Sequence, residues 1–100
     1  MDVAAQLEKL ASAGIRYLPL PGLPHYFVFE RDGFAALVEG TQDGFGGIGN
    51  AGLLTESGLA VLVWRGDRAY FRRKDFEQSA SESQVAALRR FAEDLKRALC

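Results

Sequence analysis

One tight-turn dipeptide between two apolar runs constrains the first half of this chain most. Asp32 and Gly33 separate Tyr26–Glu30 from Phe34–Glu39, and both runs are rich in β-prone apolar residues. Asp-Gly favours a two-residue hairpin turn, because both positions tolerate positive φ. The sequence therefore predicts a β-hairpin here. Its register would pair Phe29 with Ala36 and Phe27 with Val38.

A second hairpin is predicted in the other half of the chain. Gly66 and Asp67 form a good two-residue turn between the runs Leu59–Arg65 and Arg68–Arg73. The register would pair Leu62 with Phe71, Trp64 with Ala69, Val61 with Arg72, and Val63 with Tyr70. We expect the Leu62, Trp64 and Phe71 side to face the core, and the basic side with Tyr70 to face water.

Helices are predicted at both ends. Ser81 and Gln84 have the spacing of a capping box, which starts a helix with an apolar stripe at helical periodicity. That stripe consists of Val85, Leu88, Phe91, Ala92, Leu95 and Leu99. The first helix is expected to begin after Asp2 and to end near Ala13, before Gly14. Its predicted core face carries Val3, Leu7, Leu10, Ala11 and Ala13.

These elements predict one α+β domain over residues 1–100. We expect an antiparallel sheet of about four to six strands, with the N- and C-terminal helices packed on one face. The order of elements resembles that of frataxin-like domains and, more loosely, of secretion chaperones. This resemblance in outline implies a fold and no function, since the sequence motifs of neither family are present.

Composition and charge limit the classes of partner. The chain has 100 residues, 48% of them hydrophobic, a formal net charge of −1 and a pI near 5.8. This balance provides no bulk attraction to nucleic acid or to an anionic membrane. No apolar run approaches the roughly 18 residues of a membrane span, and no basic signal-peptide region is seen. We therefore expect a cytoplasmic protein without a membrane partner.

Residues 41–58 are rich in glycine and are predicted to be a connecting loop. Within them, Gly44, Gly46 and Gly49 satisfy the G-x-G-x-x-G spacing of dinucleotide-binding turns. The helix and parallel strands that this motif requires are not predicted here. A ligand or nucleotide site at 44–52 is thus an alternative hypothesis, with its phosphate neutralised from the second hairpin. Its candidate residues are Gly44, Gly46, Gly47, Gly49, Arg72 and Arg73.

Basic and aromatic residues are interleaved at 65–74, a pattern that can hold phosphates while bases stack. Asp67, Asp75 and Glu77 dilute this charge, and the acidic pI argues against nucleic acid as a partner. Nucleic-acid binding is therefore the further alternative. A solvated strand face explains the same residues more simply.

The sequence gives little sign of catalysis. His25 is the only histidine and has no nucleophile or carboxylate at an interpretable spacing, so an enzyme using it is the weakest hypothesis. Cys100 cannot form an internal disulfide and lacks the fixed pocket of a catalytic thiol. Glu39, Asp43 and Glu56 fit no known cation loop. We predict no catalytic residues, no metal and no cofactor.

The leading prediction is a small non-enzymatic interaction or adaptor domain that binds another protein or associates as a homodimer. A chain without a catalytic constellation, whose sheet has exposed edges, would act through such a surface. One candidate patch lies in the proline-rich segment and consists of Leu18, Leu20, Leu23 and Tyr26. The alternative for these side chains is that they close one end of the core.

Overall fold

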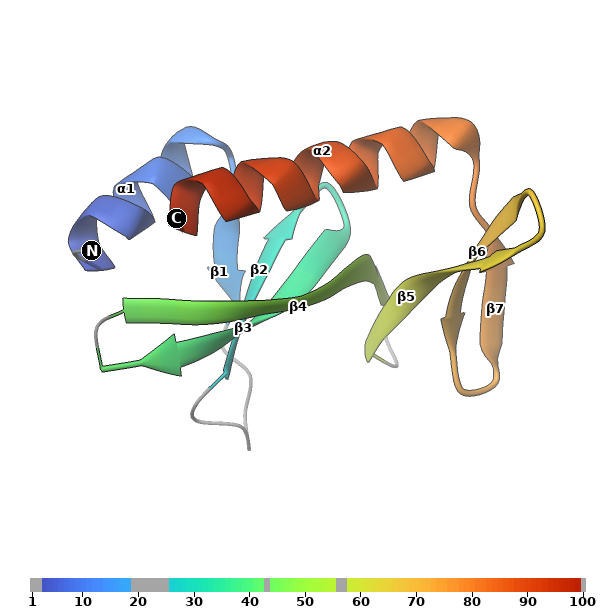
Figure 1. Cartoon of the computed structure of the whole chain (residues 1–100), viewed down its shortest axis with the longest axis horizontal. Helices are drawn as coiled ribbons and strands as arrows, with labels where there is room; N and C mark the ends of the chain where they lie inside the picture. Colours follow the sequence, from blue (N-terminus) through green and yellow to red (C-terminus); the bar gives the residue numbers. More distant parts are fainter. Residues whose placement is uncertain (1–2, 19–25, 43, 56–57, 100) are drawn as a thin grey trace.

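The computed structural model describes residues 3–18, 26–42, 44–55 and 58–99. They form a seven-stranded antiparallel sheet in which each strand pairs with the next along the chain, and two helices lie on one face (Figure 1). The predicted α+β fold is confirmed, with slightly more strands than the four to six expected. The elements are α1 (Val3–Ser12), β1 (Arg16–Leu18), β2 (Tyr26–Arg31), β3 (Phe34–Thr41), β4 (Gly44–Thr55), β5 (Gly58–Arg65), β6 (Arg68–Arg73), β7 (Phe76–Ser79) and α2 (Glu82–Leu99).

Both predicted hairpins are present in the predicted register. In the β2–β3 hairpin Phe29 pairs with Ala36. In the β5–β6 hairpin Leu62 pairs with Phe71. Asp32 and Gly33 have φ values of 55° and 89°, the left-handed conformation that a two-residue hairpin turn requires. The two turn dipeptides therefore fixed both registers.

The start of α2 is the predicted capping box. The Gln84 amide donates to the Ser81 hydroxyl over 3.1 Å, and the Ser81 amide donates to Gln84 Oε1 over 2.9 Å. Most of the predicted stripe is buried, with Phe91 and Leu95 fully inaccessible. The helix therefore begins where its sequence predicts, and it lies across the sheet by its apolar face.

The face that α1 buries differs from the prediction. Val3 and Leu7 are 39% and 44% exposed, whereas Gln6 and Leu10 are 2% exposed. Gln6 Nε2 donates to the carbonyl of Leu99 over 3.1 Å, at the end of α2. A terminal helix carbonyl has no partner within its own helix, so α1 turns a polar residue inward to satisfy it.

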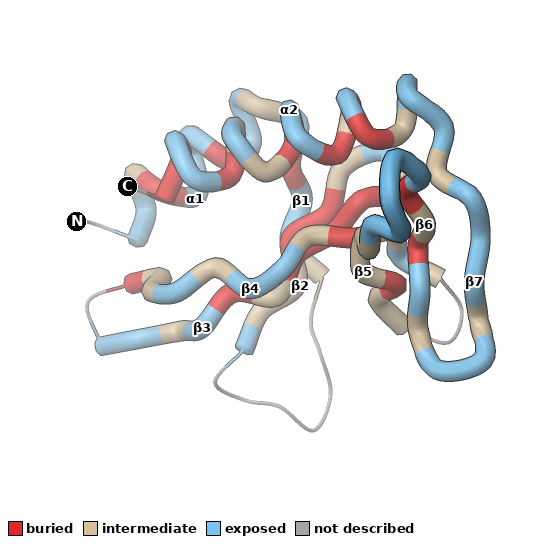
Figure 2. Tube along the Cα trace, turned by 45° about the vertical axis from the view of Figure 1, so that its right-hand side comes forward, coloured by how far each residue is buried: buried red, intermediate tan, exposed pale blue. Residues whose placement is uncertain are grey.

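The core lies between the helices and the central strands. Phe29, Phe71 and Phe91 are fully buried, and Phe29 meets Phe45 edge to face at 5.1 Å between ring centroids. Figure 2 shows the buried segments concentrated there, whereas β7 is mostly exposed. Among the described residues, neither helix is long and apolar enough to cross a bilayer.

The prediction of a glycine-rich loop over 41–58 is wrong, because Gly44–Thr55 forms the long strand β4. β4 pairs with β3 on one side and, through Gly52–Thr55, with β5 on the other. It therefore joins the two hairpins into one continuous sheet.

Two irregularities in the β3–β4 register explain why the sequence pattern did not predict this strand. Between β3 and β4 the register shifts twice, so that β4 carries an extra residue at each shift. The apolar residues of β4 that face the core lie at Phe45, Ile48, Ala51 and Leu53. Their spacing of three, three and two residues does not show the alternation that reveals an ordinary strand.

Two ion pairs anchor the N-terminal half of the sheet. Arg31 Nη1 lies 2.9 Å from Asp94 Oδ2 and also donates to the carbonyl of Ala13, which ties β2 to α2 and to the residue that follows α1. Arg16 donates to Glu30 on the neighbouring strand over 2.9 Å. This hydrogen bond, with the charge of the Glu30 carboxylate, raises the pKa of the Arg16 guanidinium above its ordinary value.

Candidate functional site

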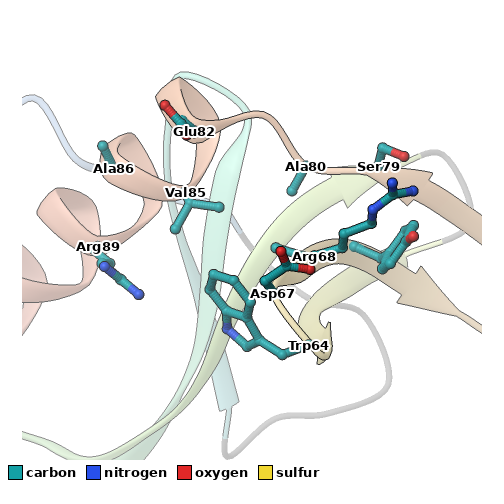
Figure 3. Close-up of a pocket in the computed structure, with 11 residues that line it drawn as sticks. Trp64, Asp67, Arg68, Ser79, Ala80, Glu82, Val85, Ala86 and Arg89 are labelled. Carbon is teal, nitrogen blue, oxygen red and sulfur yellow. The ribbon is translucent and has the colours of Figure 1, made fainter.

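A groove lies between the tip of the β5–β6 hairpin and the first turns of α2. Its volume is about 490 Å³. Figure 3 shows Trp64, Asp67 and Arg68 on the hairpin side and Glu82, Val85 and Arg89 on the helix side. The complete lining is Trp64, Asp67, Arg68, Ala69, Tyr70, Ser79, Ala80, Glu82, Val85, Ala86 and Arg89. We call this feature the Trp64 groove.

Trp64 is the largest side chain in the groove, and it is 51% exposed. The prediction that it is a core residue is wrong, although it does lie opposite Ala69 as the register requires. Two of the residues that line the groove with it, Ala80 and Ala86, have small side chains. A large indole among short side chains leaves a hollow instead of a filled core.

The groove carries charges of both signs around this ring. The guanidinium carbon of Arg89 lies 6.0 Å from the centroid of the Trp64 ring, at the limit of a cation–π contact. Within the described part of the chain, Arg68, Arg89, Asp67 and Glu82 form no ion pair. The groove therefore offers an apolar platform with two cations and two carboxylates free to meet a partner.

The junction that shapes the groove is held by backbone and cap interactions. The amide of Ala80 donates to the carbonyl of Ala69 over 2.9 Å, which extends the β6–β7 pairing up to the helix. The capping box at Ser81 then fixes where α2 begins. The groove thus lies between rigid elements, which lowers the entropic cost of binding.

The predicted glycine residues do not form an anion loop. Gly44, Gly46, Gly47 and Gly49 lie within β4, beside β3. A Cβ added at Gly44, where φ is +133°, would lie 2.6 Å from Gln6 Oε1, so this glycine lets α1 approach the sheet. Packing therefore explains Gly44 without a ligand.

The structure does not bring these glycines to the predicted arginines. Arg72 and Arg73 lie on β6, and β5 separates β6 from β4. β5 pairs only with the Gly52–Thr55 end of β4, beyond all four glycines. Ligand binding by the glycine segment stays a prediction, without the loop geometry on which it was based.

The basic residues at 65–74 are divided between different surroundings. Arg65 pairs with Glu77, with 2.7 Å between Nη1 and Oε1, and lies over Tyr70 at 5.3 Å. Arg68 lines the Trp64 groove. Arg72 is opposite Glu77 in the β6–β7 register. Nucleic-acid binding by this hairpin also stays a prediction.

Several other predictions fall outside the described residues. These are the roles of His25 and Cys100, the cap at Asp2, and the patch residues Leu20 and Leu23. Of that patch, Leu18 is half-buried and Tyr26 is 39% exposed. Of the three acidic residues considered for a cation site (Glu39, Asp43 and Glu56), Asp43 and Glu56 also lie outside the described residues. Where side chains are described, no group of three or more His, Cys, Asp or Glu gathers in a way that would hold a metal ion.

No protein-family model, no curated protein and no solved structure matches this chain. The likeness in outline to frataxin-like domains therefore carries no functional inference. What the protein does must be argued from its own surface.

Proposed function

We propose that this chain is a protein-interaction domain that binds a short segment of another protein in the Trp64 groove. The observation that carries the proposal is the exposure of Trp64, 51%, within a groove whose four charged side chains have no ionic partner among the described residues. Trp and Arg are the residue types that most often dominate the energy of protein–protein interfaces.

The composition of the groove favours an apolar anchor residue in the partner. An aromatic or aliphatic side chain laid against Trp64 would remove apolar surface from water on both sides, which stabilises the complex. The flanking cations Arg68 and Arg89 and the carboxylates Asp67 and Glu82 would set the orientation of the segment.

A selection from a displayed random-peptide library, with the folded protein as bait, tests this function. The chain contains a single tryptophan, so the fluorescence of the wild type reports directly on the groove. Calorimetry then compares each selected peptide on wild type, Trp64→Ala and Tyr17→Ala. Tyr17 is a matched control, because it is an aromatic side chain 46% exposed on β1, outside the groove lining.

We expect selected peptides to change the Trp64 emission, to lose about tenfold or more in affinity on Trp64→Ala, and to bind Tyr17→Ala within twofold of wild type. Peptides that bind Trp64→Ala as tightly as wild type would overturn the proposal, as would a selection that yields no peptide. Trp64 emission that changes with protein concentration alone would show that the occupant of the groove is a second copy of this chain.

A further inference from the structure

A second, smaller hollow lies away from the Trp64 groove. Its volume is about 290 Å³, and its lining consists of Val28, Ala36, Leu37, Leu54, Gly58, Leu59 and Arg73. We call it the Arg73 cavity. Among the described residues of this lining, Arg73 has the only polar side chain, so the cavity combines an apolar wall with a positive charge.

The apolar wall comes from two pairs of directly opposed residues. Val28 pairs with Leu37 across β2 and β3, and Leu54 pairs with Leu59 across β4 and β5. Their strand neighbours Phe29, Leu53 and Ala60 belong to the core beneath the helices. Because side chains alternate along a strand, these four residues face the opposite side of the sheet.

The guanidinium of Arg73 packs against Gly58. A Cβ added at Gly58 would lie 2.7 Å from Arg73 Cζ and 2.8 Å from Nε, and Gly58 has a φ of +129°. Only glycine leaves this space without strain. The absence of a side chain at position 58 therefore lets the guanidinium lie at the β4–β5 turn, beside the apolar wall.

The guanidinium of Arg73 has no ionic partner among the described residues. Within the described ranges, Arg73 makes no ion pair and no side-chain hydrogen bond. On the neighbouring strand β7, the carboxylate of Glu77 is already paired with Arg65. A half-buried, unpaired guanidinium next to apolar surface favours a ligand that supplies both an anion and a hydrocarbon chain.

We propose that the Arg73 cavity binds a small apolar monocarboxylate, such as a short or medium-chain fatty acid. The carboxylate accepts hydrogen bonds from the planar guanidinium, whose fork matches its two oxygens. The hydrocarbon chain lies against Val28, Leu37, Leu54 and Leu59. A neutral alcohol lacks the charge for Arg73, and an alkylammonium would be repelled by it.

The size of the cavity restricts the ligand to a free small molecule. A volume of about 290 Å³ lies at the lower end of small-ligand sites, which begin near roughly 300 Å³. Besides Arg73, the side chains that the structure describes in this lining offer no donor or acceptor for the amide groups of a peptide. The cavity therefore fits a single apolar chain better than the carboxyl terminus of another protein.

Titration with octanoate, followed by methyl NMR shifts of the cavity leucines and valine, tests this site. Octanol and octylamine serve as the neutral and cationic counterparts. The decisive variant is Arg73→Gln, which keeps hydrogen-bonding capacity but removes the charge. Its matched control is Arg72→Gln, the adjacent arginine on the same strand, which does not line the cavity. Thermal unfolding of both variants verifies that they are folded.

Octanoate should produce saturable shifts at Val28, Leu37, Leu54 and Leu59. Its affinity should fall about tenfold or more in Arg73→Gln and stay within twofold in Arg72→Gln. Across hexanoate, heptanoate and octanoate, affinity should rise about fourfold per added methylene until the cavity is full.

Three results with the alkyl ligands would overturn the inference. They are the absence of saturable shifts, equal affinity of octanol and octanoate, and undiminished octanoate binding by Arg73→Gln. Tighter binding of a short leucine-rich peptide than of octanoate would equally refute a small-molecule site, and would assign the cavity to a protein terminus. Trp64→Ala should leave octanoate binding unchanged, because the two sites share no lining residue.

Discussion

The two hairpins of this protein form by the same local rules, but they differ in how deeply their aromatic side chains are buried. One is closed by Asp32-Gly33 and the other by Gly66-Asp67, and both have the register that their turns predict. Yet the β2–β3 hairpin buries Phe29 completely, whereas the β5–β6 hairpin leaves Trp64 51% exposed. A turn and an alternating pattern therefore decide which face a residue is on, but not whether that face is covered.

The helices that cover the two hairpins are distant in the sequence, and they cover the first hairpin more completely than the second. Over the β2–β3 hairpin lie α1 and the C-terminal part of α2, and Arg31 contacts α2 and the residue that follows α1 (Figure 1). Over the β5–β6 hairpin lies only the start of α2, which presents Val85 and Ala86. Phe71 of the β5–β6 hairpin is therefore buried in the core like Phe29, whereas Trp64, nearer the turn, forms the wall of a groove.

The largest expected effect is a contrast between truncations of the two aromatics. Phe29→Ala should lower the free energy of unfolding by about 3–5 kcal/mol, since it removes a fully buried ring and leaves a cavity. Trp64→Ala should cost less than about 1 kcal/mol, because much of the indole is already in water. Urea denaturation measures both. A loss from Trp64→Ala as large as that from Phe29→Ala would contradict the comparison, and Phe29→Leu provides a milder check if the alanine variant is unfolded.

The next prediction concerns the strand that joins the hairpins. A Cβ at Gly52 would collide with the carbonyl of Ala60, whereas one at Gly47 would meet only Glu39 Oε2, at 4.0 Å. Gly52→Ala should therefore destabilise the fold by about 1–3 kcal/mol, and Gly47→Ala should stay within about 0.5 kcal/mol of wild type. Equal, small effects in chemical denaturation would indicate that the segment behaves as the loop its composition predicts.

The features that the sequence predicted correctly depend on residues close together in the chain. The Asp32-Gly33 turn and the Ser81–Gln84 capping box each involve two residues at fixed spacing, whose geometry is decided locally. The inward side of α1 was missed because it depends on Leu99, 93 residues away, whose carbonyl Gln6 satisfies. β4 was missed because its register shifts remove the alternation that marks a strand.

The candidate sites were less predictable than the fold for the same reason. The Trp64 groove joins residues 64–70 to 79–89 across a helix–sheet junction. The signals that could have indicated it are a tryptophan two residues before a turn and the alanines at 80 and 86. Arg73 was predicted as a candidate ligand residue together with the glycines of 44–49, and its role in binding stays a prediction. It lies beside Gly58 and the apolar wall, not beside Gly44–Gly49.

The two hairpins should also differ in how much an ion pair of each contributes to the free energy of unfolding. The side chains of Arg31 and Asp94 are only 18% and 25% exposed, and Arg31 also satisfies the carbonyl of Ala13. Arg31→Met should therefore cost about 1–2 kcal/mol, because it leaves Asp94 Oδ2 and the carbonyl of Ala13 without this donor, although Arg97 still contacts Oδ1. Arg65→Met, in the solvent-exposed pair with Glu77, should cost less than about 0.5 kcal/mol. The difference should persist in 1 M salt, and its disappearance there would show that the Arg31 contact is a screened surface interaction.

The smallest effect tests how firmly the groove end of α2 is held. Ser81→Ala removes the acceptor for the Gln84 amide and should cost about 1 kcal/mol. Ser83→Ala is the matched control, because Ser83 is an exposed serine two residues further along whose side chain makes no hydrogen bond to any described residue. Hydrogen exchange at the amides of Gln84 and Val85 should accelerate in Ser81→Ala, while exchange around Phe91 should change only by the global loss of stability.

Since Val85 and Arg89 line the groove from this first part of the helix, peptides bound there should lose affinity in Ser81→Ala and not in Ser83→Ala. Unchanged peptide affinity despite a frayed first turn would mean that the hairpin side, with Trp64 and Arg68, carries the binding alone.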